Sequence, residues 1–482
     1  MTPTTERMSK VDTAWLRMDS ESNLMMIVGV WSIRPGVTLA ALRARIGERL
    51  LQYPRFRQRV VEDTMGAQWV EDDDFDLDRH VVAELLMPMR GESRDAVLKK
   101  RVGELAMQPL DPEYPLWQFQ LVEDVGDGSS ALIARIHHCI ADGIALIGVM
   151  LSITDGGMSP PKRRPKLVDE DEPAEEPDWL TEAFLRPITD MTVKAIALAG
   201  AGVAKSVETV IKQPNLVDSG VDLARMGRQA ISDVAAFALM ADDSPTRLKG
   251  KAGTTKVVAW DDGLPLDVVK VVGKALNASI NDVLLACVAG AIGSYLAGKG
   301  DDPTGQEIRA MVPVNLRPLE QAWQLGNKFG LVPLLLPIGM PNPVERLYAV
   351  RSRMQALKGS FQPMLAFGLL SVAGLMIKPV QHAMLNIFAK KTTAVMTNVP
   401  GPAKPLHLCG GKVERVLVWV PQSGDVGIGV SILTYAGKVQ FGLITDSTLC
   451  PDPQAIIDRF APEFEKLLTV ALMLPWGEDP EA

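Results

Sequence analysis

The amino-acid sequence predicts an α/β protein in which two domains with mixed sheets are joined by a helical connector. The chain has 482 residues, of which 47% are hydrophobic, and this is more than a single core usually organises. Short apolar runs typical of strands alternate with helical patterns in both halves of the chain. Between the halves lies a stretch rich in proline and charge, which cannot form a core.

The first domain is expected over residues 1–158. Thr38 can cap a helix that Pro54 ends. The apolar residues of this helix recur at helical spacing: Leu39, Leu42, Ile46 and Leu50. Further along, Ala131–Ile136 is a short apolar run, which predicts a buried strand.

Residues 159–249 are expected to form a charged linker and a helical connector. The prolines and charges gather before residue 178, and the chain from Trp179 to about Met240 has a helical pattern. Its most apolar part, Ala195–Ala204, is far shorter than the ~20 residues that span a bilayer. The lysine-containing stretch Ile188–Lys212 fits a helix that rests on lipid as well as a helix that packs between the domains.

The second domain is expected over residues 250–482. Two strand-like runs, Val426–Tyr435 and Lys438–Thr445, are joined at Ala436-Gly437, which predicts an antiparallel hairpin. An amphipathic helix over Asp452–Leu474 follows.

Composition excludes several classes of function. A net charge of −8 is unfavourable for binding nucleic acid, so no nucleic-acid partner is expected. The cysteines lack the short paired spacing of a zinc or redox motif: Cys139, Cys287, Cys409 and Cys450. We therefore expect reduced thiols and no metal. Since Met1–Lys10 has no apolar core of a secretory signal, we expect a cytoplasmic protein.

The segment with the clearest chemical content is His137–Gly143, which lies between the predicted strand and an apolar helix. Histidine is the side chain best suited to accept a proton at neutral pH, and a strand end can hold it still. Asp142 falls at the start of the helix, where a carboxylate accepts free backbone N–H groups, so we expect it to fix the loop. Gly143 allows a close approach or a backbone conformation that a Cβ would forbid.

From the residues alone, two interpretations of the paired histidines stay open. They fit a catalytic base, and they also fit buried side chains that are hydrogen-bonded for packing. The chain has only 5 histidines and no second ligand pair that would complete a metal site. It also lacks the G-x-S-x-G elbow of hydrolases and the G-x-x-x-x-G-K loop of nucleotide hydrolases.

The string H-H-x-x-x-D-G resembles the active-site motif of the CoA-dependent acyltransferase superfamily, which includes chloramphenicol acetyltransferase, carnitine acyltransferases and peptide-synthetase condensation domains. Over nearly its whole length the chain resembles the bacterial wax ester synthase/diacylglycerol acyltransferase family within it. The blocks that carry this resemblance occur in the family's order: Met8–Asp12, Pro54–Arg59, Phe75–His80, Pro115–Trp117, Asn281-Asp282, Pro313–Arg317, Gly326-Asn327 and Thr397–Pro402. Tyr114 departs from the family, because an arginine is common there. Ser423–Gly427 replaces the D-F-G-W-G block of the plant enzymes.

The resemblance implies two chloramphenicol-acetyltransferase-like domains with the active site at their interface. It implies that a hydroxyl acceptor attacks the acyl-CoA thioester directly, with His138 as the general base and His137 supporting the loop or partly contacting substrate. Asn281 would donate a hydrogen bond to the oxyanion. Ser279 and Asp282, however, also fit a capping box at the start of a helix over Asn281–Leu296, whose apolar surface on all sides predicts burial.

The remaining candidates are expected to bind substrate: Gly143, Pro115, Leu116, Trp117, Asn398 and Arg317. Trp117 also fits an ordinary buried tryptophan, and the Thr397–Pro402 segment also fits a rigid turn at the domain interface. Lys390-Lys391 and Arg317 are candidate partners of the CoA phosphates, and the lysine pair also fits a solvated face.

The partners implied are acyl-CoA and either diacylglycerol or a fatty alcohol, with acyl-CoA as substrate and no cofactor. Since the products are insoluble, we expect the cytoplasmic protein to act at the inner membrane or at a lipid-droplet surface. The rival interpretations are an amide-forming condensation-type enzyme and a non-catalytic lipid-binding paralogue.

Overall fold

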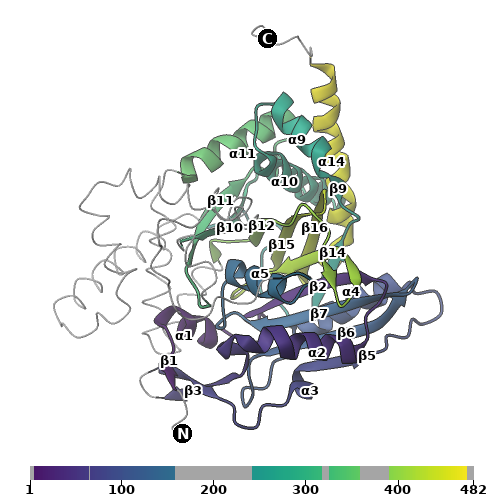
Figure 1. Ribbon diagram of the computed structural model, residues 1–482. Coiled ribbons are helices and arrows are strands. Elements are labelled where there is room, and N and C mark those ends of the chain that lie inside the picture. Colours follow the sequence, from purple (N-terminus) through teal and green to yellow (C-terminus); the bar gives the residue numbers. More distant parts are fainter. Residues whose placement is uncertain (1–4, 64–65, 158–241, 317–324, 359–389, 475–482) are drawn as a thin grey trace, which may run out of the picture.

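The computed structural model describes residues 5–63, 66–157, 242–316, 325–358 and 390–474, and it has two mixed-topology sheets flanked by helices (Figure 1). The predicted α/β class is therefore confirmed. The predicted linker and connector fall on residues outside the described ranges, and the domain limits stay a prediction.

The sheet that carries the histidines has the strand order β13-β14-β2-β7-β6-β5. Its strands are β2 (Met26–Arg34), β5 (Val81–Glu84), β6 (Trp117–Gly126), β7 (Ser129–His137), β13 (His407–Leu408) and β14 (Gly411–Trp419). β5 and β6 are parallel, and the other neighbours are antiparallel. Every residue of β7 is buried, which confirms the buried strand predicted over Ala131–Ile136.

The helices of the first half are α1 (Lys10–Arg17), α2 (Leu39–Arg49), α3 (Leu77–His80), α4 (Arg94–Ala106) and α5 (Gly143–Ser152). The Thr38 hydroxyl accepts the Ala41 N–H, so α2 begins as predicted, and short 3-10 turns follow at Leu50–Gln52 and Pro54–Phe56. A small sheet beside α1 has the order β1 (Glu6–Arg7), β4 (Gly66–Glu71), β3 (Gln58–Asp63).

Strand β14 comes from the far end of the chain and completes the first sheet. It pairs antiparallel with β2, so that Val416 lies opposite Trp31 and Trp419 opposite Val28. The sequence pattern did not predict this exchange. β2 therefore lies between the histidine-bearing strand β7 and β14, a strand from the second half.

The second sheet has the order β11-β10-β12-β15-β16-β8, with β9 also paired to β16. Its strands are β8 (Lys256–Trp260), β9 (Leu264–Pro265), β10 (Ile308–Asn315), β11 (Phe329–Leu336), β12 (Ala394–Pro400), β15 (Ile428–Tyr435) and β16 (Lys438–Asp446). The predicted hairpin is confirmed, because β15 and β16 pair antiparallel and the joining residues Ala436 and Gly437 have positive φ angles of 48° and 79°.

The alternative interpretation of Thr397–Pro402 as a rigid turn is wrong for most of its length, because the segment is largely strand. Residues up to Pro400 belong to β12 and pair with β15. Within the described residues, β10 pairs with β12 only near Ala394 and Val395. The far end of β12 therefore lacks a ladder on that side, and such a position tolerates proline.

The helices that pack on the second sheet are α9 (Leu266–Ala275), α10 (Ile280–Gly298), α11 (Pro343–Lys358) and α14 (Gln454–Met473). The last of these confirms the helix predicted over Asp452–Leu474. The Ser279–Asp282 capping box at the start of α10 is also confirmed. By length and composition α10 could cross a membrane, but 78% of its apolar window is buried inside the protein, as expected of a core helix. A Cβ at Gly293 would lie 2.0 Å from the Ile338 carbonyl oxygen, so α10 packs against backbone there.

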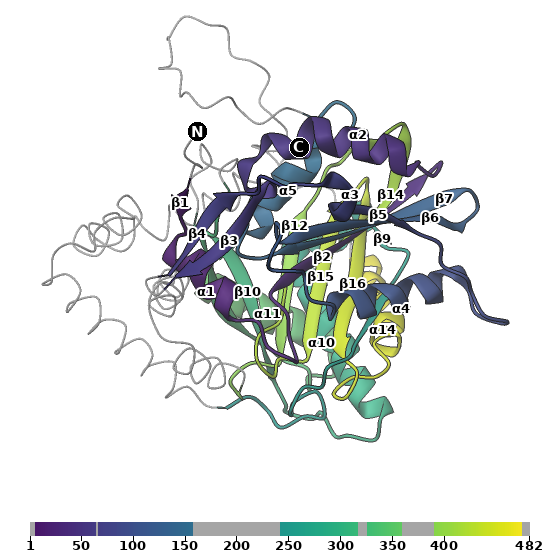
Figure 2. The same cartoon turned by 90° about the horizontal axis from the view of Figure 1, so that it is seen from below.

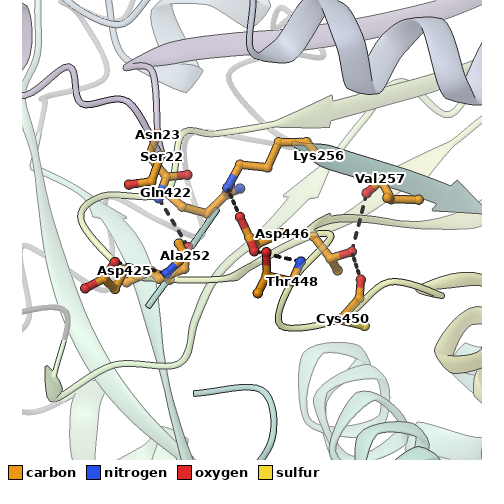
Figure 3. Close-up of polar contacts among 12 residues, drawn as sticks. Ser22, Asn23, Ala252, Lys256, Val257, Gln422, Asp425, Asp446, Thr448 and Cys450 are labelled. Atoms are coloured by element: carbon orange, nitrogen blue, oxygen red, sulfur yellow. Dashed lines mark hydrogen bonds and ion pairs between the residues drawn. The ribbon is translucent and has the colours of Figure 1, made fainter. Parts of the chain in front are cut away.

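Two of the sets of contacts that join the halves lie away from the histidine loop. α4 packs on β8, and in Figure 2 it lies beside β16 and α14, where Lys99 donates to Gln454. The second set is shown in Figure 3. Asn23 Nδ2 donates to the Gly424 carbonyl at 2.6 Å and, more weakly, to Val426 at 3.4 Å, and behind this loop Lys256 and Asp446 form a fully buried ion pair at 3.6 Å.

Candidate active site

The histidine motif begins at the last residue of β7 and ends at the first residue of α5, as predicted. The His137 N–H donates to the Leu116 carbonyl at 2.9 Å, and the His138 N–H donates to the Met25 carbonyl at 2.7 Å. Backbone from two neighbouring segments of the first half therefore fixes both histidines before any side-chain contact is made.

The His138 side chain is buried in an aromatic clamp. Its imidazole stacks on the Trp15 indole with ring centroids 4.3 Å apart, and Phe329 lies 5.4 Å away on a tilted plane. Burial lowers the pKa of His138 to about 4, although its own carbonyl, Asp142 and Asn327 oppose the shift. At neutral pH the ring is uncharged, and only the uncharged ring can accept a proton.

His137 makes contacts suited to holding the loop. Its Nδ1 accepts the Cys139 N–H at 3.1 Å, and its Nε2 lies 3.4 Å from a carboxylate oxygen of Asp19. A neutral ring that accepts at Nδ1 carries its hydrogen on Nε2, which faces Asp19. The supporting role predicted for His137 fits this geometry and stays a prediction.

Asp142 joins the loop to the second half of the chain. One carboxylate oxygen accepts the Ala145 N–H at 3.0 Å and caps α5, as predicted, while the other accepts the Lys328 N–H at 3.0 Å. The Asp142 N–H in turn donates to the Gly326 carbonyl at 3.3 Å. The carboxylate thus holds the loop between α5 and the segment that leads into β11.

Gly143 is not required by the backbone. It is not among the glycines with a positive φ, and an added Cβ would meet no described atom within 4 Å. The expectation of a conformation that a Cβ would forbid is therefore wrong. A close approach of substrate to this helix start stays a prediction.

Pro115, Leu116 and Trp117 are all buried, and the Leu116 carbonyl accepts the His137 N–H. Trp117 donates its indole N–H to the Phe56 carbonyl at 2.9 Å and stacks on His80 at 4.5 Å. These contacts make Trp117 a core residue at the start of β6, which is the ordinary outcome for a buried tryptophan.

Asn281 and Asn398 lie together, which the sequence did not predict. The Asn398 Nδ2 donates to the Asn281 Oδ1 at 2.9 Å, so the start of α10 meets the end of β12. In the described part of the chain, no hydrogen bond links this pair to His138, and the oxyanion role stays a prediction. Arg317 lies outside the described residues, and Lys391 is paired with Asp242 at 2.6 Å.

Sequence reasoning missed Trp15, Asn327 and Phe329, which contact His138, and Asp12, which holds Asn327. Asn327 Nδ2 donates to the His138 carbonyl at 2.7 Å and to Asp12 at 2.8 Å. The segments Met8–Asp12 and Gly326-Asn327 carried the family resemblance, which was the available signal, but no pattern linked them to the histidines. The site as a whole is a buried neutral imidazole that both halves of the chain fix in place.

Comparison with known sequences agrees with this geometry. Residues 8–284 match the wax ester synthase/diacylglycerol acyltransferase catalytic domain, and residues 325–468 match the C-terminal domain of the same family. A probable diacylglycerol O-acyltransferase of Mycobacterium tuberculosis is 25% identical over 92% of this chain and 92% of its own length. A Mycobacterium bovis protein named as a diacylglycerol O-acyltransferase is 27% identical over 84% of this chain and 77% of its own.

Solved structures share the fold. The wax ester synthase/diacylglycerol acyltransferase of Marinobacter aquaeolei superposes with a TM-score of 0.66 at 20% identity, covering 98% of this chain and 100% of that one. The starter condensation domain of rhizomide synthetase, solved with C8-CoA and Leu-SNAC, gives 0.54 at 13% identity, covering 97% of this chain and 95% of that one.

Proposed function

Because the chain belongs to the wax ester synthase/diacylglycerol acyltransferase family, we propose that it transfers a long-chain acyl group from acyl-CoA to a hydroxyl acceptor, with His138 as the general base. The observation that carries this proposal is the state of His138. Its ring is neutral, clamped between aromatic side chains, and fixed by both halves of the chain.

The proposed reaction needs no acyl-enzyme. A neutral imidazole nitrogen of His138 removes the proton from the acceptor hydroxyl, while the hydroxyl oxygen attacks the thioester carbonyl carbon. The tetrahedral intermediate then breaks its C–S bond, and the CoA sulfur leaves with the proton held by the imidazolium. The products are an ester and CoA, and the base returns to its neutral form.

The substrate class is proposed from the relatives. Several are named as diacylglycerol O-acyltransferases, and the Marinobacter protein is also named as a wax ester synthase. We therefore propose diacylglycerol and fatty alcohols as acceptors, with acyl-CoA as the donor and no separate cofactor. We also propose that the protein works at a lipid surface, since its acceptors and products are insoluble.

The test is a CoA-release assay with one long-chain acyl-CoA and three acceptors offered separately: a diacylglycerol, a long-chain alcohol and a long-chain amine. Thiol release with the hydroxyl acceptors supports the proposal. Release with the amine alone would favour an amide-forming enzyme, and no release above blank would favour a non-catalytic lipid-binding protein.

His138→Ala tests the base. It should lower kcat by about 10²- to 10⁴-fold while the protein stays folded. The matched control is His407→Ala, which removes an exposed histidine on β13 and should leave kcat unchanged. A near-normal rate in a folded His138→Ala protein would remove the base assignment.

A further inference from the structure

The segment between β5 and α4 carries three apolar side chains in solvent. Leu85, Met87 and Met89 are 66%, 82% and 68% exposed, and they are among the most exposed large hydrophobic side chains of the described residues. In Figure 2 this segment, residues 85–92, extends beyond the sheet at the right of the view, and we call it the arm. Single exposed apolar residues are common on proteins, whereas a group of them marks an interaction site.

An alternating pattern places these three side chains on one face of the arm. Leu86 packs against the buried apolar cluster that contains Leu98 and Val102 of α4, whereas the residues on either side of Leu86 are exposed. Successive side chains of an extended chain point to opposite faces. A chain that buries Leu86 therefore presents its neighbours on the outer face to solvent.

A tight turn fixes the tip of the arm. The Glu92 N–H donates to the Met89 carbonyl at 3.0 Å, and a Glu92 carboxylate oxygen accepts the Met89 N–H at 3.1 Å. Gly91 lies within this turn and has a φ of 93°, a conformation that favours glycine. Hydrogen-bonded backbone thus presents Met89, so little further ordering is needed when a partner binds.

Arg90 adds a positive charge at the same tip. It is exposed, and no ion pair to it occurs in the part of the chain that the structure describes. Arg94 at the start of α4, by contrast, is paired with Asp124 at 2.7 Å. An arginine beside apolar side chains can lay its stem on apolar material while its guanidinium binds a phosphate. The arm therefore combines groups that suit acyl chains with a group that suits phosphate.

The size of the patch favours a lipid surface over a second copy of the chain. A stable interface between proteins buries about 800 Å² on each partner and involves about 20 to 30 residues a side. Three side chains on a projecting segment cannot supply such an area. Insertion into lipid has no such requirement, because each apolar side chain that leaves water contributes by itself.

We propose that the arm docks the protein on a phospholipid surface, with Leu85, Met87 and Met89 inserted among the acyl chains and Arg90 at the phosphate groups. Docking brings the enzyme to the surface that holds its insoluble acceptor. This inference rests on the proposed function at a lipid surface.

The binding test compares two double variants of the full-length protein. Leu85→Ser/Met87→Ser changes the arm, and Leu472→Ser/Met473→Ser is the matched control, because these residues at the end of α14 are of the same two types and are 63% and 79% exposed. In sedimentation with phosphatidylcholine vesicles, the arm variant should bind about 10- to 100-fold more weakly than the wild type. The control should bind normally, and both variants should melt at the wild-type temperature because the replaced side chains lie in solvent.

A fluorophore on the arm gives a direct readout of insertion. Met87→Cys labelled with an environment-sensitive thiol dye should shift its emission to shorter wavelengths when vesicles are added, and labelled Met473→Cys should not. The wild type, taken through the same labelling, gives the background from Cys409, which is a free and only partly buried cysteine.

Three results would overturn the proposal: a wild type that does not bind vesicles, an arm variant that binds as well as the wild type, or a control that loses binding. A wild-type dimer in analytical ultracentrifugation that the arm variant loses would assign the arm to a second copy instead. CoA release with a medium-chain alcohol dissolved in buffer isolates the chemistry, and both variants should keep the wild-type kcat there. No release by any protein, the wild type included, would instead be a failure of the proposed function.

Discussion

The Trp15 indole lies nearly flat on the His138 imidazole, with an interplanar angle of 16°. Trp15 stands on α1, one turn beyond Asp12, and Ser9 caps that helix by accepting the Asp12 N–H at 3.0 Å. The same short helix thus holds one face of the ring through Trp15 and reaches the backbone of His138 through Asp12 and Asn327.

Replacing Trp15 should separate ring stacking from bulk packing. An aromatic pair is worth about 0.5–1.5 kcal/mol beyond the area that it buries, so Trp15→Leu should lower kcat by roughly 2- to 10-fold more than Trp15→Phe, which can still stack. Steady-state CoA release measures both. Equal kcat values in the two variants would show that the stack does not orient the base.

The low pKa of His138 predicts the pH dependence of activity. With its pKa near 4, the ring stays neutral at pH 5.5, where an ordinary histidine would be mostly charged. The acid limb of kcat/KM should therefore lie below pH 5. A limb near pH 6.5 in a pH–rate profile would contradict the burial of the base.

The same shift predicts a loss of stability in acid. Since the folded pKa is below the unfolded value of 6.5, the unfolded chain binds more protons, and stability falls as the pH drops from 6.5 towards 4. Between pH 7.5 and 5.5 the wild type should lose about 1.4 kcal/mol more than His138→Leu in urea unfolding. Parallel losses in the two proteins would argue against a neutral buried ring.

Replacing Asp142 should lower both the stability and the activity of the protein. Asp142→Ala removes the cap of α5 and leaves the Lys328 N–H without this acceptor, which together should cost about 2 kcal/mol or more and lower kcat as well. Asp142→Asn keeps one oxygen that can cap the helix, so it should be more stable than Asp142→Ala. It should be less stable than the wild type, because its amide cannot accept both N–H groups. Urea unfolding and CoA release measure the two effects. A fully stable Asp142→Ala protein would exclude the capping role.

The core of the second half should depend on one buried ion pair. Arg346 and Glu463 are 4% and 3% exposed and contact each other directly. Glu463→Ala leaves the guanidinium buried without its charge partner and should cost about 3–5 kcal/mol. The exposed pair Arg94–Asp124 is the control, and Asp124→Ala should cost less than about 1 kcal/mol. Similar losses in the two variants would contradict this.

Features that depend on neighbouring residues were predictable from the sequence. The Thr38 and Asp142 caps, the Ser279–Asp282 capping box and the hairpin at Ala436-Gly437 each rest on contacts within a few positions of the chain. Hydrophobic period and capping chemistry therefore sufficed to find these elements. The motif at His137–Gly143 was found for the same reason, since its strand, loop and helix follow one another.

The surroundings of His138 were not predictable in this way. Asn327 is 189 residues from His138 and 315 from Asp12, and no local period records such a contact. Gly143 shows the opposite error, because a glycine in a motif suggested a backbone need that the structure does not have. The resemblance marked both distant segments as meaningful without saying that they meet.

The pairing of β14 with β2 bears on how the protein is synthesised. When the ribosome has made the first 160 residues, the histidine motif is present, but the edge of β2 that pairs with β14 is still open. The histidine loop also lacks its hydrogen bonds to Gly326 and Lys328. That nascent half presents an unpaired strand edge to other chains until residue 419 has emerged. A first half made as an independent polypeptide would keep this exposed edge unless a second half supplied β14.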